Sequence, residues 1–234
     1  EGKSPRRYKY SGSDDAKEVG WIYWNSDLRA HAVGMLKPNA LGLYDMTGNV
    51  SELCANQGGA EYLDAKSQKD YRVDRGCFYD ITDLGSYERT GFYIGDNTRR
   101  PTRTGIRLAL SQLPKSVSIH LDKSPQPSSR SELIAKLVND MIQVPAGTFT
   151  MGFVFPELRQ YYIPPKEMAP HQVTLDSYYL CKYEVTQALW QAIMGVNPSE
   201  NQDDANQPVT NVGCSDIKLF ISKLNALSGQ QFRL

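Results

Sequence analysis

Several features that would point to common function classes are missing from this sequence. No uninterrupted apolar run is long enough to cross a bilayer, so no membrane span is expected. The 26 lysines and arginines balance the 26 aspartates and glutamates, and this gives no reason to expect nucleic acid or an anionic membrane as a partner. The first residue is Glu1 rather than methionine, which indicates a sequence boundary or a processed end; a signal or lipoprotein anchor upstream would not be visible.

Cysteine and histidine are also scarce. The cysteines are Cys54, Cys77, Cys181 and Cys214. They include no CxxC pair, and no cluster of histidines accompanies them, which argues against a zinc site. Because their spacing does not select a connectivity, disulfides and buried thiols are both open as alternatives.

The composition of the first half of the chain predicts loops joined by short strands. Aromatic residues and glycines dominate it, and helix signals are few. Strands are expected at 74–79 and 105–110. In the second of these, alternation places Arg107 on the face opposite Ile106 and Leu108.

The second half is more regular and predicts both strands and helices. Strands are expected within 141–151 and within 173–183, where aromatic and β-branched residues gather. Thr186 is a natural N-cap for a helix that runs to Met194, and Gly195 stops it.

A second main helix is predicted over 216–227, with Ser215 as its cap and Gly229 at its end. Its apolar residues recur at helical spacing and form one stripe, which we interpret as core. The stripe consists of Ile217, Phe220, Ile221, Leu224 and Leu227.

Composition changes between the two halves. Prolines and serines gather after residue 114 and cannot build a core, and a short amphipathic run follows at 132–138. We therefore divide the chain into a first half at 1–110, a Pro/Ser-rich linker at 111–138, and a second half at 139–234.

Short motifs in both halves form a specific set. In the second half they are 144–152 (VPAGTFTMG), 182–186 (KYEVT), 208–212 (PVTNV) and 232–234 (FRL). In the first half they are 42–52 (GLYDMTGNVSE), 75–76 (RG) and 104–109 (TGIRLA). Together they resemble the formylglycine-generating-enzyme family, also called sulfatase-modifying factor domains. The resemblance covers most of the chain outside the linker. It implies a loop-rich α+β, C-type-lectin-like fold with short antiparallel strands and two main helices.

The motifs stand in the opposite order to the family's. The family's N-terminal half resembles residues 139–234, and its C-terminal half resembles residues 1–110. One chain can close as a circular permutant, because the terminal strands of the C-type-lectin-like fold lie side by side. Alternatively, halves of different chains complement each other in a domain-swapped homo-oligomer. Neither half alone should bury its apolar surface well, and we favour the permutant.

The resemblance also implies a chemistry that this sequence does not complete. The family's enzyme uses two nearby cysteines in its late segment to bind copper and to engage a substrate thiol. The corresponding run, 75–89, holds only Cys77, so we expect neither copper nor catalysis. The alternative is a divergent sulfatase-modifying oxidase in which Cys77 pairs with a distant cysteine such as Cys54.

A calcium site is a further implication of the resemblance. The family's Gly-Asn-Val-x-Glu loop is similar to GNVSE here and offers the hard oxygen ligands that calcium prefers. We expect Asn49 and Glu52 to bind through side chains and Val50 through its carbonyl. The sequence departs from the family in having Ser51 and Leu53 where tryptophans are usual. In the alternative interpretation, both residues are structural: Asn49 shapes a turn, and Glu52 forms a cap or an ion pair.

The last candidate is a recognition surface in the region 78–103. In lectin-like variable proteins similar to this family, the corresponding segment displays binding residues. Rigid aromatic and adaptable polar side chains alternate here, a mixture that suits ligand binding. The candidates are Phe78, Tyr79, Asp80, Tyr87, Arg89, Tyr93, Asp96, Asn97 and Arg99.

The sequence therefore predicts a non-catalytic, bacterial, C-type-lectin-like domain that recognises a protein or glycan ligand. An extracellular or cell-envelope location is expected from the resemblance. The alternatives are the divergent oxidase and a structural subunit of a bacterial surface assembly.

Overall fold

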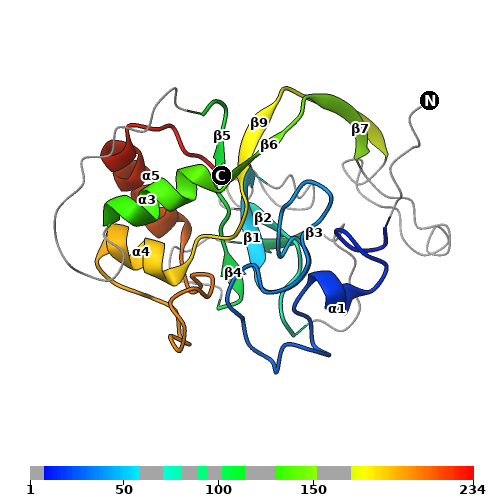
Figure 1. The fold of residues 1–234 in the computed structure, drawn as a ribbon, viewed down its shortest axis with the longest axis horizontal. Helices are drawn as coiled ribbons and strands as arrows, with labels where there is room; N and C mark the ends of the chain where they lie inside the picture. The colour runs from blue at the N-terminus through cyan, green and yellow to red at the C-terminus, as the bar shows by residue number, and fades with distance from the viewer. Residues whose placement is uncertain (1–7, 58–70, 81–88, 94–101, 114–129, 152–169) are drawn as a thin grey trace.

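The computed structural model describes residues 8–57, 71–80, 89–93, 102–113, 130–151 and 170–234 (Figure 1). Short strands and helices joined by long irregular connections confirm the α+β class. Three helices gather on one side of the strands, whereas the loops of the first half lie on the other side together with a fourth, short helix (Figure 1). The three are α3 (Arg130–Asn139), α4 (Gln187–Met194) and α5 (Cys214–Ser228), and the fourth is α1 (Ala16–Val19).

The first half of the chain builds a four-stranded sheet. Its order is β3 (Arg89–Tyr93), β2 (Tyr71–Arg75), β1 (Ser51–Gln57) and β4 (Thr104–Gly105). β1 pairs antiparallel with β2, where Leu53 lies opposite Asp74, and parallel with β4, where Glu52 lies opposite Gly105. β1 therefore sits inside the sheet, with the GNVSE loop leading into it.

A three-stranded antiparallel sheet joins the two halves. Its order is β5 (Ala109–Leu110), β9 (Tyr178–Cys181) and β6 (Met141–Val144). Ala109 lies opposite Leu180 and also exchanges both backbone hydrogen bonds with Arg233 next to the C-terminus. The strands β7 (Gly147–Met151) and β8 (His171–Leu175) form a separate antiparallel pair.

The predicted helices form, with one boundary changed. α4 begins after Thr186, whose hydroxyl accepts a hydrogen bond from Leu189 N, and ends at Gly195 with φ 83°. The N-cap of α5 is Gly213 rather than the predicted Ser215. The helix starts earlier because the Asp216 carboxylate accepts a hydrogen bond from Gly213 N at 3.0 Å.

One hydrophobic core receives side chains from both halves. Ile106 and Leu108 of the first half are fully buried, and they belong to the same cluster as Trp190 and Phe220 of the second half. The rings of Trp190 and Phe220 stack with their centroids 4.6 Å apart. The predicted stripe of α5 is correct except for Leu227, which is 49% exposed because it lies in the last turn, beyond the core.

The end of the predicted linker is part of this core. Residues from 130 onward form α3, and its Ile134 and Val138 are buried. Both halves thus pack together within one chain, whereas the permuted order relative to the family stays a prediction. In the described residues, no helix combines the length and apolar character that crossing a membrane requires.

Candidate functional site

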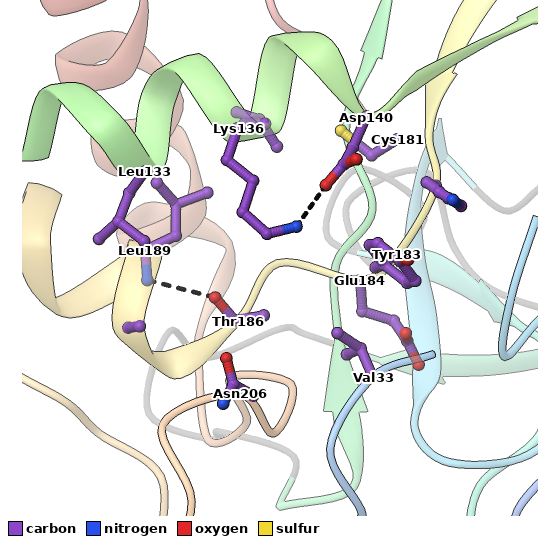
Figure 2. A pocket seen from close by; sticks show the side chains of 13 residues that line it. Val33, Leu133, Lys136, Asp140, Cys181, Tyr183, Glu184, Thr186, Leu189 and Asn206 are labelled. Carbon is purple, nitrogen blue, oxygen red and sulfur yellow. Dashed lines mark hydrogen bonds and ion pairs between the residues drawn. The ribbon is translucent and has the colours of Figure 1, made fainter. Parts of the chain in front are cut away.

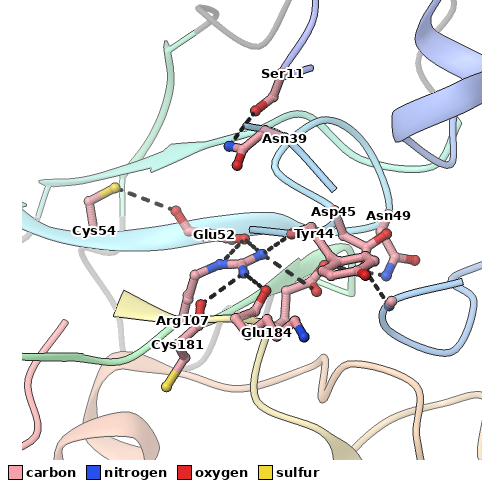
Figure 3. A network of polar contacts seen from close by, with 12 residues as sticks. Ser11, Asn39, Tyr44, Asp45, Asn49, Glu52, Cys54, Arg107, Cys181 and Glu184 are labelled. Carbon is pink, nitrogen blue, oxygen red and sulfur yellow. Dashed lines mark hydrogen bonds and ion pairs between the residues drawn. The ribbon is translucent and has the colours of Figure 1, made fainter. Parts of the chain in front are cut away.

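A buried guanidinium lies at the junction of the two halves (Figure 3). The side chain of Arg107 is 2% exposed, since its neighbours Ile106 and Leu108 point into the core and direct it to the opposite face as predicted. Its Nε and Nη2 atoms donate to Glu52 Oε1 at 2.9 and 2.6 Å. The remaining donors reach backbone carbonyls: Nη1 those of Cys181 and Lys182, and Nη2 that of Tyr44. Arg107 therefore binds segments from both halves.

Two further carboxylates share this buried environment. Glu184 Oε2 lies 3.6 Å from Arg107 Nη2, and Asp45 Oδ2 accepts a hydrogen bond from Gly34 N at 2.7 Å. Desolvation by burial raises the pKa of Asp45 to about 6 and raises the pKa of Glu184 well above its ordinary value. Burial opposes the charge of Arg107, but Glu52 and Glu184 outweigh this and raise the pKa of its guanidinium. The cluster thus combines a charged guanidinium with two carboxyl groups, those of Asp45 and Glu184, that retain protons more readily than usual.

Asn49 connects this cluster to the surface loops. It is fully buried and has φ 60°, a left-handed conformation that asparagine tolerates better than most residues. Its side chain accepts from His31 N at 2.9 Å and donates to His31 O and to Glu184 Oε1. Its backbone N–H donates to Trp21 O, and its carbonyl accepts from Tyr79 N. One residue thus holds two surface segments and the buried cluster together.

The residues predicted to bind calcium are engaged by the protein itself. Glu52 Oε1 is bound to Arg107, Asn49 Oδ1 accepts from His31, and Val50 is fully buried. A calcium ion would have to compete with a guanidinium for Glu52, and among the described residues no three His, Cys, Asp or Glu side chains gather as a metal site would need. This donor set does not fit calcium well, and the calcium site stays a prediction.

Residues 20–31, here called the aromatic loop, are held by an internal hydrogen-bond framework. The side chain of Asn25 accepts from Ile22 N and donates to Gly20 O. Ser26 is fully buried, and its hydroxyl donates to Tyr79 O at 2.6 Å. The ring of Trp21 stacks on that of His31 at 3.9 Å between centroids. The backbone of this loop is therefore constrained although it contains no regular secondary structure.

This constrained loop exposes large side chains. Trp24 is 60% exposed and Tyr23 is 43% exposed, and their rings meet edge to face at 5.0 Å. Asp27 and Leu28 follow with φ 53° and 57°. A left-handed backbone is costly for a bulky residue such as Leu28, which is itself 57% exposed. Strain at a well-supported turn that displays apolar side chains is typical of a functional surface.

The predicted recognition residues are only partly placed. Phe78, Tyr79 and Asp80 follow β2 and are half-buried. Arg103 lies over the Phe78 ring at 5.3 Å and pairs with Asp80 at 2.6 Å. Of the others, Arg89 and Tyr93 lie in β3 without described side chains; outside the described residues are Tyr87, Asp96, Asn97 and Arg99.

Sequence reasoning missed the aromatic loop as a candidate. The signal was present in the adjacent Tyr23 and Trp24, followed by the polar run Asn25, Ser26 and Asp27. Without the tertiary contact between Ser26 and Tyr79, nothing connected this run to the predicted surface at 78–103. The structure brings the two segments together.

A separate pocket of about 210 Å³ lies between α3, the start of α4 and the segment before it (Figure 2). Leu133 and Leu189 line its apolar side, and Lys136, which is paired with Asp140, lines its polar side together with Tyr183. The backbone N–H groups at the start of α4 already have protein acceptors. Acidic and basic residues both line the pocket, Lys136 and Lys182 with Asp140 and Glu184, and the helix start offers no unused N–H group, so we assign the pocket no ligand.

The thiols are arranged in two classes. Cys77 and Cys181 are buried at 3% and 2% exposure, and burial raises the pKa of Cys181 to about 12. Cys54 and Cys214 are half-buried. The burial of Cys77 argues against the alternative in which it acts as a catalytic thiol with Cys54.

A family profile described as the sulfatase-modifying factor enzyme 1-like domain matches residues 1–112 and 128–234. Chaperone protein LppX of Paenibacillus barcinonensis is 35% identical over 71 residues, which cover 23% of this chain and 25% of that protein. This chain therefore matches about a quarter of the length of that curated relative.

Two solved structures are also similar in part. Treponema denticola variable protein 1 is 29% identical, with 44% of this chain and 40% of that chain covered and a TM-score of 0.33. The crystal structure of CarF is 26% identical, with 38% and 33% covered and a TM-score of 0.28. At these scores the likeness is partial.

Replacing Arg107 should destabilise the protein strongly. Arg107→Met would leave the half-buried carboxylate of Glu52 without its counter-charge and three backbone carbonyls without their donor, and we expect a loss of about 3–5 kcal/mol in the free energy of unfolding. Urea denaturation followed by tryptophan fluorescence measures this loss. The exposed Arg29→Met is the matched control and should change stability by at most about 0.5 kcal/mol. Equal effects of the two substitutions would contradict the role of the buried cluster.

The carboxyl of Asp45 should give stability a defined pH dependence. Its folded pKa of about 6 exceeds the ordinary value of 3.8. At pH values between these two, the folded protein therefore keeps a proton on Asp45 that the unfolded chain has released. The stability from protonated Asp45 is complete below about pH 4 and is lost as pH rises through about 6. Relative to Asp45→Asn, the wild type should lose stability across this window in urea titrations. Parallel curves for the two proteins would show that Asp45 is not the group responsible.

Proposed function

This chain belongs to the family of sulfatase-modifying factor enzyme 1-like domains, and from that premise we propose that it is a non-catalytic recognition domain that binds a protein ligand. The family match confirms the resemblance that the motifs indicate. The proposed binding surface comprises the aromatic loop together with Phe78, Asp80 and Arg103. The observation that carries the proposal is the exposure of Trp24 on a backbone held from several sides.

The composition of this surface supports binding. Interface residues that contribute most of the binding energy are enriched in tryptophan, tyrosine and arginine. Here Trp24 and Tyr23 are exposed, and Arg103 has a side chain 49% exposed next to Asp80. Because the loop is ordered before binding, little conformational entropy would be lost on association.

A protein is favoured over a glycan by the aliphatic side chain in this surface. Leu28 is 57% exposed and offers none of the hydrogen bonds that sugar hydroxyls require. A protein partner with an apolar pocket could cover Leu28 together with Trp24. The curated Paenibacillus barcinonensis relative is named a chaperone protein, a description that agrees with a protein-binding role here. We place the domain outside the cytoplasm, in the cell envelope, on the family resemblance.

The absence of catalysis can be tested directly. The run at 75–89 offers a single thiol, and Cys77 is buried, so no pair of soft ligands can hold copper there. Purified protein incubated with a sulfatase-motif peptide, copper, a reductant and oxygen should leave the peptide cysteine unchanged by mass spectrometry. A formylglycine-generating enzyme serves as positive control. Conversion of the cysteine to an aldehyde by this chain would overturn the proposal.

The binding surface can be tested by site-specific photocrosslinking. A benzoylphenylalanine placed at Leu28 should capture a discrete partner from envelope fractions of the organism that encodes the protein, and Trp24→Ala should reduce this capture at least about tenfold. The control is the same probe at Val196, which is 64% exposed in the second half. The products are read by gel mobility and peptide mass spectrometry.

Two results of that experiment would contradict the proposal. Capture that survives Trp24→Ala, or that is equally strong from Val196, would show that the aromatic loop is not the binding surface. Binding to a glycan array that Trp24→Ala abolishes would keep the surface but overturn the choice of a protein ligand.

A further inference from the structure

A second cavity lies at another place where the halves meet. It has a volume of about 390 Å³ and is bounded by β1 of the first half and by α5 and the last three residues of the second. Its walls are mostly apolar, with Leu53, Ile217 and Phe232 among them. Two thiols line it as well, Cys54 from β1 and Cys214 from the start of α5.

Both thiols lie in regular secondary structure, Cys54 in β1 and Cys214 in α5. Cys54 follows Leu53, which is buried in the core, and its Sγ lies 3.6 Å from Glu52 O. Cys214 is the first residue of α5 and packs against the core cluster, so the start of that helix determines its position. Both side chains border the same cavity.

Accessibility also separates this pair from the other cysteines. Cys54 and Cys214 are half-buried, whereas Cys77 and Cys181 are almost completely buried. An oxidant from solution can therefore reach the first pair while the protein stays folded, and the second pair stays protected. The sequence left the connectivity open, and burial together with the shared cavity selects one pairing.

We propose that Cys54 and Cys214 form a disulfide across this cavity and thereby join the two halves of the domain covalently. The thiolate of one cysteine attacks a sulfur of a small disulfide oxidant such as oxidised glutathione, and one thiol of the oxidant leaves. The second cysteine then attacks the mixed disulfide and releases the other thiol. The protein loses two protons and two electrons, and the oxidant becomes two thiols.

The cross-link would stabilise the contact between the two halves of the domain. It would close a loop of about 160 residues that includes the whole linker, and long closed loops restrict the unfolded chain most. It would also bind β1, which carries Glu52, to the half that carries Glu184, so the Arg107 cluster would stay assembled. The inference is independent of the proposed ligand, and only its occurrence in the cell depends on an oxidising compartment.

The experiment uses the purified full chain at low concentration with oxidised glutathione. A non-reduced digest should yield one cross-linked peptide pair that contains Cys54 and Cys214, and non-reducing electrophoresis should show a monomer. The urea midpoint should rise on oxidation and return on reduction with dithiothreitol. Cys54→Ser and Cys214→Ser should each abolish both the cross-link and the rise, and both sites tolerate a small polar side chain because they are half-buried.

Other products would overturn the inference in distinguishable ways. Glutathione adducts on both cysteines without a cross-link would show that the thiols cannot reach each other. A different pairing in the folded protein would show that the cavity does not select the partners. A covalent dimer linked through Cys54 and Cys214 would show that these thiols pair between chains and not within one chain.

Discussion

The fold depends on one buried guanidinium. Arg107 donates to Glu52 and to Tyr44 O in the first half and to two backbone carbonyls in the second, and Glu184 completes its charge environment. A buried cation without such partners would be prohibitively costly, so the halves can pack only in the arrangement that supplies them. The hydrophobic core provides most of the driving force, whereas this cluster specifies which surfaces meet.

The same cluster controls the surface through Asn49. The side-chain amide of Asn49 links Glu184 to His31, and its backbone links Trp21 to Tyr79. The buried cluster therefore helps to position the aromatic loop and the segment that contains Tyr79. A loop without regular structure would ordinarily be mobile. Here the buried side chains of Ser26 and Asn49 hold the aromatic loop, which explains how its backbone can be constrained while Trp24 is exposed.

The family scaffold of this chain is assembled from packing and hydrogen bonds, not from paired cysteines. The motifs that match the family form the core, the buried cluster and the strand pairs, and these do not depend on catalytic cysteines. The single thiol in the late segment, Cys77, is buried in a turn with φ 63°. One fold can carry many functions, because function depends on the sites built on it.

The sequence by itself determined the α+β class, the family, the two main helices and the stop signals at Gly195 and Gly229, because these depend on local periodicity and capping. It also placed Arg107 opposite its apolar neighbours. It could not reveal that Asn49 joins two loops, that Ser26 reaches Tyr79, or that cysteines of different halves face one cavity. Those contacts connect residues far apart in the chain, and only tertiary packing decides which distant groups meet.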